Sequence, residues 1–454
     1  MGSLPDSKYI IQTDGYWFVE AHDVDSSKGH ITVSAKGIAN GLSSIPNDGA
    51  DFGPDTYDPN YTGSGIPYTQ TSGIQEAVNY MPTTYPSGGE IRLVGTNGGR
   101  FYIDAGILIN TVNISLVGSA TLGEVSIGSN SNLSYIIKST AFYTIVKNIA
   151  IHGNTSGYSG IIATGIDFSQ PSSIATNNML DGVSFNGTFT SYIVNMDNND
   201  ACVWRNTQVG NTTDATAMVS WLVPGGAKAT LIYCTVGTMQ VAIQNLIVIG
   251  SYMDEMFVTV NSIPLMTIQI IGCYQDSGRP MINVSSGVTV SYLSWTGYFQ
   301  IPNGGYVLDG SGTINKVSLD GLSLQVVGGT LPLGWANSTL TVNDYINLHG
   351  SFSGQPGETS IPNAPFNISS EGLLISGTAT TPSVPASGTA QQNTNPYPVN
   401  VYIYGGTVTV IDYTPNGGSA TQVGTAGPAT VRLNPGDSIT LTYSAAPTWN
   451  WVAV

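Results

Sequence analysis

Two stretches of this sequence repeat one pattern at a fixed distance. Residues 247–254 read IVIGSYMD and residues 269–276 read QIIGCYQD, an offset of 22 residues. In both, an apolar run leads to a glycine, and a tyrosine follows two positions later. A strand that recurs at a period in the low twenties predicts a solenoid, because a single repeat of that length cannot bury its apolar face alone.

Apolar runs of the same kind occur throughout the middle of the chain. Residues 91–95 (IRLVG) and 114–118 (ISLVG) lie 23 residues apart, and Asn, Gly and Ser separate the later runs. A β-sandwich also has short strands, but it would not repeat a glycine–tyrosine pair after 22 residues. The sequence therefore predicts an all-β fold whose main part is a parallel β-helix, with side chains alternating inward and outward along each strand.

One helix is predicted, just before the first of these runs. Ile74, Ala77, Val78 and Met81 have helical spacing, which gives a short amphipathic helix with one apolar face. Pro82 is expected to end it.

Composition divides the chain into four parts. Residues 1–72 are poorly periodic and are interpreted as an N-terminal arm, and residues 73–351 as the β-helix. Residues 352–395 include a low-complexity tract without charges from Ser376 to Asn395 and are interpreted as a linker. Residues 396–454 alternate cleanly between apolar and polar positions, which predicts a small antiparallel β-sandwich or jelly-roll. There, Trp449 and Trp451 share one face, and core packing is favoured over a carbohydrate platform.

Charge is scarce and mostly negative. The chain has 28 acidic and 12 basic residues, and charged residues make up 9% of it, against about 25% in ordinary proteins. This balance argues against nucleic acid as a partner, because phosphates require clustered Lys and Arg. No apolar run is long enough to span a membrane, and no secretory leader is visible. Scarce carboxylates leave acid unfolding little to act on, so we hypothesise an extracellular life in acid; an ordinary extracellular β-protein rich in Ser, Thr and Asn is the alternative.

The best candidate for catalysis is a pair of carboxylates. Asp254 and Asp276 are separated by the local period of 22, so they are expected to stack on adjacent rungs, roughly 5 Å apart. That separation is typical of retaining glycosidases, and Glu255 is adjacent. Chance alignment of acids along a β-helix is the competing interpretation.

A metal site is a weaker candidate. Asp48, Asp51, Asp55 and Asp58 lie within eleven residues and offer oxygen ligands for Ca²⁺. The stretch lacks EF-hand spacing, and turns stabilised by Asp and Asn side chains are the favoured interpretation. The three cysteines, at 202, 234 and 273, show no metal-binding spacing and are expected to be buried free thiols.

A family resemblance adds to these predictions. The order GIQEAV, GGEIRLVG, FYI…ILI…ISLVG resembles the start of pectate-lyase-like right-handed parallel β-helix proteins, in which the helix caps the first rung. The sequence lacks the set of motifs of that family's polygalacturonase-like hydrolases, and His152, in IHGN, is interpreted as an ordinary polar corner. The arrangement of arm, β-helix, linker and terminal β-domain resembles a viral tailspike or tail fibre.

The phrases IPNDGADFGPDT and VRLNPGDSITLTYSAAPTWNWV look most like tail fibres of archaeal viruses that infect acidophilic hosts. That resemblance implies a homotrimer on the virion surface that attaches to host polysaccharide or S-layer glycoprotein. Tyr252, Tyr274, Trp295 and Tyr298 are the residues predicted to bind glycan by stacking. Two alternatives stay open: an extracellular polysaccharide-degrading hydrolase or lyase, and a structural or adhesin module of a cell surface.

Overall fold

A computed structural model describes most of the chain. It covers residues 10–13, 16–19, 29–34, 51–53, 69–94, 99–119, 125–171, 174–209, 218–223, 227–259, 266–275, 279–301, 305–326, 334–353, 381–395 and 398–453. The chain forms two compact units: Met1–Gly297 with Asp309–Ser318 and Thr339–Tyr345, and Tyr298–Leu308 with Leu319–Ser338 and Ile346–Val454. Among the described residues, no helix is long and apolar enough to cross a membrane.

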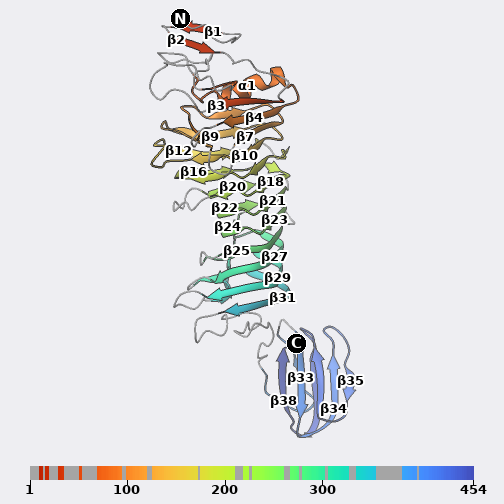
Figure 1. The fold of residues 1–454 in the computed structure, drawn as a ribbon. Helices are drawn as coiled ribbons and strands as arrows, with labels where there is room; N and C mark the ends of the chain where they lie inside the picture. Colours follow the sequence, from red (N-terminus) through yellow and green to blue (C-terminus); the bar gives the residue numbers. More distant parts are fainter. Residues whose placement is uncertain are drawn as a thin grey trace. The chain divides into compact units, whose positions relative to one another are not determined.

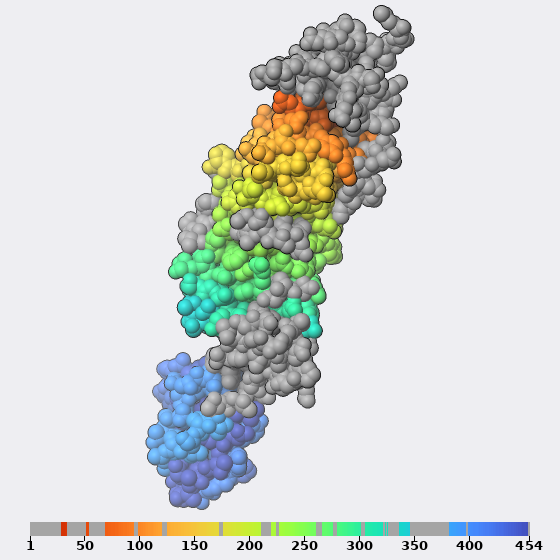
Figure 2. Space-filling model, turned by 90° about the vertical axis from the view of Figure 1, so that its left-hand side faces the viewer, coloured from red at the N-terminus to blue at the C-terminus, as the bar shows by residue number. Residues whose placement is uncertain are grey.

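The first unit is a parallel β-helix, which confirms the predicted fold class (Figure 1). The parallel pairings fall into three rows of strands, which we call the first, second and third sheets, and the sequence colours follow one another in chain order along the β-helix (Figure 2). The first sheet contains β3 (His30–Ser34), β4 (Gly89–Val94), β7 (Ile114–Gly118), β10 (Ile145–Lys147), β14 (Met179–Asp181), β18 (Cys202–Arg205), β21 (Lys228–Ile232), β23 (Asn245–Ile249) and the start of β25 (Met266–Gln275). Its strands pair in parallel.

The second and third sheets are built in the same way. The second contains β5 (Arg100–Tyr102), β8 (Ser126–Gly128), β11 (Ala150–His152), β15 (Ser184–Asn186), β19 (Gln208–Val209) and the starts of β22 (Thr235–Ala242) and β24 (Tyr252–Val258). The third contains β6 (Ile107–Ile109), β9 (Leu133–Ser139), β12 (Ile162–Asp167), β16 (Phe189–Asn195), β20 (Met218–Leu222), the ends of β22 and β24, and β26 (Ile282–Val284).

Nine further strands are described before the C-terminal domain. They are the antiparallel pair β1 (Ile10–Thr13) and β2 (Tyr16–Val19), the short parallel pair β13 (Ile174–Ala175) and β17 (Asn199–Asp200), and β27 (Thr289–Ile301), β28 (Tyr306–Gly310), β29 (Thr313–Val326), β30 (Gly334–Ala336) and β31 (Thr341–Ser353). β3 lies within the predicted N-terminal arm, yet it pairs in parallel with β4. That strand therefore belongs to the β-helix sheet.

The register confirms one predicted repeat and corrects the other. Ile247 lies opposite Gln269, and Tyr252 opposite Tyr274, which is the predicted offset of 22. Ile91, however, lies opposite Leu116 rather than Ile114. The slip is two residues, and because side chains alternate with a period of two, it leaves the same face turned inward.

On the inward face of the first sheet, each strand from β4 to β25 adds one apolar side chain to a column that runs along the core of the β-helix. Its members are in register and fully buried: Ile91, Leu116, Val146, Leu180, Trp204, Leu231, Val248 and Ile270. Burial of one such side chain is worth about 1.5–3 kcal/mol. Stability therefore comes from contacts between neighbouring rungs.

A left-handed residue turns the chain at the corner between the first and second sheets. Asn148, Gly182, Asn206, Tyr233 and Gly250 have φ of 54°, 66°, 49°, 53° and 56°. The backbone N–H of each donates to the carbonyl at the end of the next strand of the first sheet, at 2.9–3.0 Å. Gly and Asn adopt this conformation most readily, which explains the predicted Asn and Gly corners.

The helix α1 (Ile74–Thr84) closes the first rung. Ile74, Ala77, Val78 and Met81 are buried, as predicted. Gln75 of α1 pairs with β6: its Nε2 donates to the carbonyl of Leu108 at 3.0 Å, and its Oε1 accepts from the N–H of Leu108 at 2.7 Å. The side chain thus makes the two hydrogen bonds that a preceding strand would make at this sheet edge.

The predicted end of the helix was wrong by two residues. Pro82 lies inside α1, and the helix continues to Thr84. The N–H of Tyr85 still reaches the carbonyl of Met81 at 2.7 Å. Proline removes a donor only at its own position, so the last turn forms around it.

The C-terminal domain is the predicted antiparallel β-sandwich. One sheet has the order β32 (Ala390–Gln392), β37 (Ser438–Ala445), β34 (Thr407–Thr414), β35 (Thr421–Gly424), and the other β36 (Ala429–Leu433), β33 (Val399–Tyr404), β38 (Thr448–Ala453). Trp449 and Trp451 are 4% and 2% exposed within the core between them. Core packing of these two rings is confirmed.

Part of the predicted linker belongs to this domain. β32 pairs with β37, the carbonyl of Pro382 accepts from Trp449 Nε1 at 2.7 Å, and the carbonyl of Pro385 accepts from the hydroxyl of Tyr443 at 2.7 Å. Residues 381–395 therefore pack on the sandwich despite their low-complexity composition. Residues 354–380 lie outside the described residues.

The corner geometry generates one prediction. Gly272 has φ +61° and open space around its Cα, so Gly272→Ala should cost only the left-handed backbone penalty, about 1–2 kcal/mol. At Gly118 an added Cβ would lie 2.1 Å from the carbonyl oxygen of Asn148, so Gly118→Ala must move backbone and should cost more. Denaturant unfolding of both variants checks this, and equal losses would contradict it.

The two tryptophans of the sandwich generate another. Trp449→Phe and Trp451→Phe remove the same volume, but only Trp449 has a hydrogen-bonded indole; Trp451 Nε1 is buried and has no partner among the described residues. Trp449→Phe should therefore destabilise the domain by about 1 kcal/mol more. Thermal unfolding of the two variants measures the difference, and a larger loss at Trp451 would refute the assignment.

Candidate functional site

The outer face of the second sheet carries two neighbouring tyrosines. Each follows a corner glycine by two positions, and because the residue between them points inward, the tyrosine points outward. Tyr252 and Tyr274 lie directly opposite each other, with ring centroids 6.0 Å apart and ring planes inclined by 33°. Tyr274 is 45% exposed, and Tyr252 is partly exposed. Two of the four predicted glycan-binding residues therefore form one aromatic surface.

A carboxylate accompanies these rings. The hydroxyl of Tyr252 donates to Asp254 Oδ1 at 2.7 Å. The other carboxylate oxygen lies over Gly237, where an added Cβ would be 3.6 Å from Asp254 Oδ2. Asp254 is only partly buried. The site thus combines stacking surface with a hydrogen-bond acceptor, the combination that sugar rings require.

The predicted pair of carboxylates stays a prediction, since Asp276 lies outside the described residues. Glu255, the third candidate, is held in an ion pair. It is 7% exposed, and its Oε2 accepts from Arg279 Nη1 at 3.0 Å. Burial raises the pKa of Glu255, and Arg279 opposes that rise. Glu255 is a buried member of an ion pair at the end of the site.

Of the other two predicted glycan-binding residues, one was wrong. Trp295 is 1% exposed and lies on the inward face of β27, like Leu293 two residues earlier, so its ring is part of the core. Tyr298 lies in the second unit, where its hydroxyl donates to Gln325 Oε1. The aromatic surface of the first unit is therefore smaller than predicted.

The predicted calcium ligands are mostly untested. Asp48, Asp55 and Asp58 lie outside the described residues. Asp51 is 2% exposed, and its Oδ2 accepts from the N–H and the hydroxyl of Thr32 at 2.7 and 2.8 Å. That carboxylate ties the segment to β3 and acts as a structural group. Among the described residues, no cluster of His, Cys, Asp or Glu has the arrangement of a metal site.

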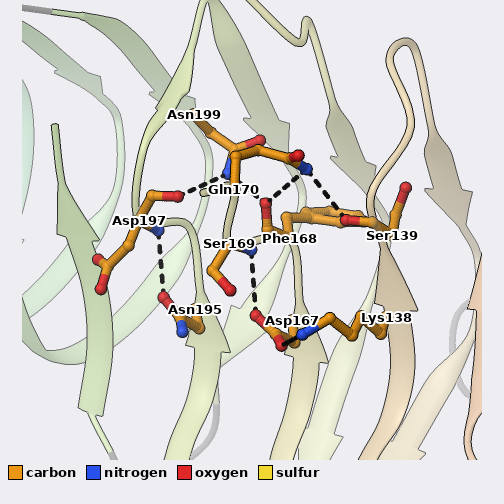
Figure 3. A network of polar contacts seen from close by, with 9 residues as sticks. All are labelled: Lys138, Ser139, Asp167, Phe168, Ser169, Gln170, Asn195, Asp197 and Asn199. Atoms are coloured by element: carbon orange, nitrogen blue, oxygen red, sulfur yellow. Dashed lines mark hydrogen bonds and ion pairs between the residues drawn. The ribbon is translucent and has the colours of Figure 1, made fainter. Parts of the chain in front are cut away.

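A buried amide network lies at the C-terminal ends of the third-sheet strands β9, β12 and β16 (Figure 3). Gln170 Nε2 donates to the carbonyls of Ser139 and Phe168 at 3.1 and 3.2 Å, and Asn199 Nδ2 donates to the carbonyls of Phe168 and Asp197, the latter at 3.1 Å. The side chain of Asp197 accepts from Leu222 N–H at 2.9 Å. These groups satisfy backbone atoms at a buried turn, so this network is structural.

The three cysteines are buried free thiols, as predicted. Burial raises the pKa of Cys202 and Cys234 to about 11 and also raises that of Cys273. Protonated buried thiols are unreactive.

Sequence reasoning missed a second aromatic group on the same sheet face. The ring of Tyr158 lies between those of Tyr102 and His152, at centroid distances of 5.0 and 4.9 Å. Its hydroxyl lies 3.0 Å from Ser126 Oγ. Tyr158 belongs to a turn that folds back over β8, and no local pattern announces that fold. The glycine at 128 leaves room for this ring, since an added Cβ there would lie 2.6 Å from it.

No family model and no curated protein matches the chain. Among solved structures, ORF18 of Geobacillus virus E2 is 14% identical over 96% of this chain and 82% of that one, with a TM-score of 0.41. Full-length tailspike protein 2 of Escherichia coli bacteriophage CAB120 is 13% identical over 99% and 65%, with a TM-score of 0.38. A double mutant of the tailspike of E. coli bacteriophage HK620 is 12% identical over 93% and 92%, with a TM-score of 0.38. At these identities no residue of this chain is assigned a role.

The buried ion pair gives a pH-dependent prediction. Because the folded-state pKa of Glu255 is raised above its ordinary 4.5, its contribution to stability is complete below that value and is lost as pH rises through the folded pKa. Arg279→Gln raises this pKa further. We expect the variant to lose roughly 1–3 kcal/mol at neutral pH and little at about pH 4.

Chemical unfolding at the two pH values measures this difference. Arg432→Gln, an exposed arginine of the C-terminal domain, is the matched control and should behave alike at both. A loss for Arg279→Gln that does not depend on pH would contradict the assignment.

Proposed function

We propose that this chain is a tailspike- or tail-fibre-type protein of a virion surface, which attaches to glycan or glycoprotein on the host cell. The observation that carries the proposal is the in-register pair Tyr252 and Tyr274, at 6.0 Å, beside the hydrogen-bonded carboxylate of Asp254. Stacked rings with adjacent acceptors on a rigid sheet suit sugars, because they offer apolar ring faces and hydroxyl donors together.

The finer assignment is also a proposal. The resemblance to fibres of archaeal viruses suggests polysaccharide or S-layer glycoprotein of an acidophilic host as the receptor, and a homotrimer as the assembly. Scarce charge supports function in acid. So do Glu255 and Asp197, because burial raises the pKa of both, and their contribution to folding is therefore largest at low pH. Ca²⁺ bound by the Asp48–Asp58 segment is proposed only as an accessory.

The test is retention of the purified protein on host-surface polysaccharide. Tyr252→Ala and Tyr274→Ala should each weaken retention about threefold to tenfold, as loss of one aromatic contact does. Tyr402→Ala removes a tyrosine of similar exposure, 41%, from the C-terminal domain and serves as control. Unchanged retention in both β-helix variants would overturn the proposed binding face.

Products are analysed in the same experiment. Release of oligosaccharide that is lost in Asp254→Asn would make the protein a polysaccharide-degrading enzyme, with Asp276 the candidate partner. Neither retention nor release would favour the third alternative, a cell-surface structural or adhesin module.

A further inference from the structure

We propose that the second sheet carries a further subsite, formed by Arg100, Tyr102 and the Tyr158 turn, for a sugar that bears an anionic group, a carboxylate or a sulfate. The inference rests on the proposed function, since it names the chemical class of glycan that the same sheet face would bind.

The subsite has a rigid aromatic base. Tyr158 is 2% exposed and is fixed by Ser126, by Gly128 beneath its ring, and by a tight turn in which Thr155 and Tyr158 exchange both backbone hydrogen bonds at 2.8 and 3.0 Å. The ring of Tyr102 packs against the ring of Tyr158 and is 46% exposed. An exposed ring held from behind loses little freedom when a sugar stacks on it.

Arg100 supplies the charge. It is exposed, and an added Cβ on Gly157 of the Tyr158 turn would lie 3.6 Å from its Nη1. It lies close enough to His152 to lower the pKa of that imidazole, although burial is the larger cause. A side-chain hydrogen bond with Tyr102 raises the pKa of Arg100, and among the described residues Arg100 is in no ion pair.

A guanidinium that is hydrogen-bonded to an exposed tyrosine and is in no ion pair among the described residues selects a particular chemistry. Its planar set of donors binds carboxylate or sulfate through two parallel hydrogen bonds, while Tyr102 receives the sugar ring. His152, which packs against Tyr158, has a buried Nδ1 with no hydrogen-bond partner among the described residues. A neutral glycan would use the ring and leave the guanidinium unused.

The subsite and the Tyr252–Tyr274 pair occupy one line. Ser126, Ala150, Ser184, Gln208 and Thr235 connect Arg100 to Tyr252 in unbroken register. Six strand steps separate the two sites, about 29 Å at the usual strand spacing. Ser126, Ala150 and Ser184 are covered, so a polymeric glycan that reaches both sites passes over the segments that cover them, and contact with both raises its overall affinity above that of either site.

The experiment measures retention on three immobilised polymers: polygalacturonate, which carries carboxylates, dextran sulfate, and neutral dextran. The intact protein should be retained by at least one acidic polymer and much less by dextran. Arg100→Gln should weaken that retention about tenfold, the usual effect of losing a hydrogen bond to a charged group, and added salt should weaken it too. Tyr102→Ala should also weaken it. Which acidic polymer responds identifies the anionic group.

Arg205→Gln, an exposed arginine of β18 in the first sheet, is the matched control and should change nothing. Equal retention on all three polymers, or no response to Arg100→Gln, overturns the subsite. Binding of host polysaccharide that depends on Tyr252 but not on Arg100 overturns the subsite alone and leaves the proposed function intact. No retention on host polysaccharide or on any of the polymers overturns both.

Discussion

The β-helix from β10 onward depends on a left-handed residue at the corner between its first and second sheets. At Asn148, Gly182, Asn206, Tyr233 and Gly250 the chain turns with positive φ, and the N–H at the turn bonds to the next rung. The turn ends one strand and starts another within three residues, so the corner backbone stays paired where most proteins have a solvent-exposed loop. Rungs can then stack without a gap in their hydrogen bonding.

The same corner places the candidate functional groups. The residue after the corner points inward and the next points outward, which puts Tyr252 and Tyr274 on the outer face. The register of the second sheet aligns Arg100, six strand steps earlier, with Tyr252. Core packing sets the same register from inside, because each rung must bring one apolar side chain to the central column. The arrangement of binding groups is therefore a consequence of how the rungs stack.

Sequence reasoning succeeded where the signal was local and repeated. Glycine two residues before tyrosine, recurring after 22 positions, gave the fold and the register of Tyr252 against Tyr274. The weaker match at Ile91 gave a register two residues off, since a slip of two preserves burial and leaves no trace in an apolar pattern. The prediction for Trp295 was wrong because Trp295 follows Tyr274 by 21 residues rather than 22, and a shift of one residue turns a side chain to the other face of the strand.

Other features depend on contacts between distant segments. The Tyr158 turn folds back over β8, and its aromatic stack with His152 cannot be read from either segment alone. The tract from 381 to 395 has the composition of a linker, yet its backbone carbonyls and β32 find partners in the sandwich. Composition indicates how a segment behaves in isolation, and here pairing with a neighbouring sheet gives residues 381–395 a fixed structure.

Hydrogen exchange at the corners tests the central claim most directly. The backbone amides of Asn148, Gly182 and Asn206 should be as well protected as those of the strands beside them, because each donates to the next rung. Exchange as fast as that at the surface turn of Ser156 and Gly157 would show that the corners are open loops, and would contradict the account.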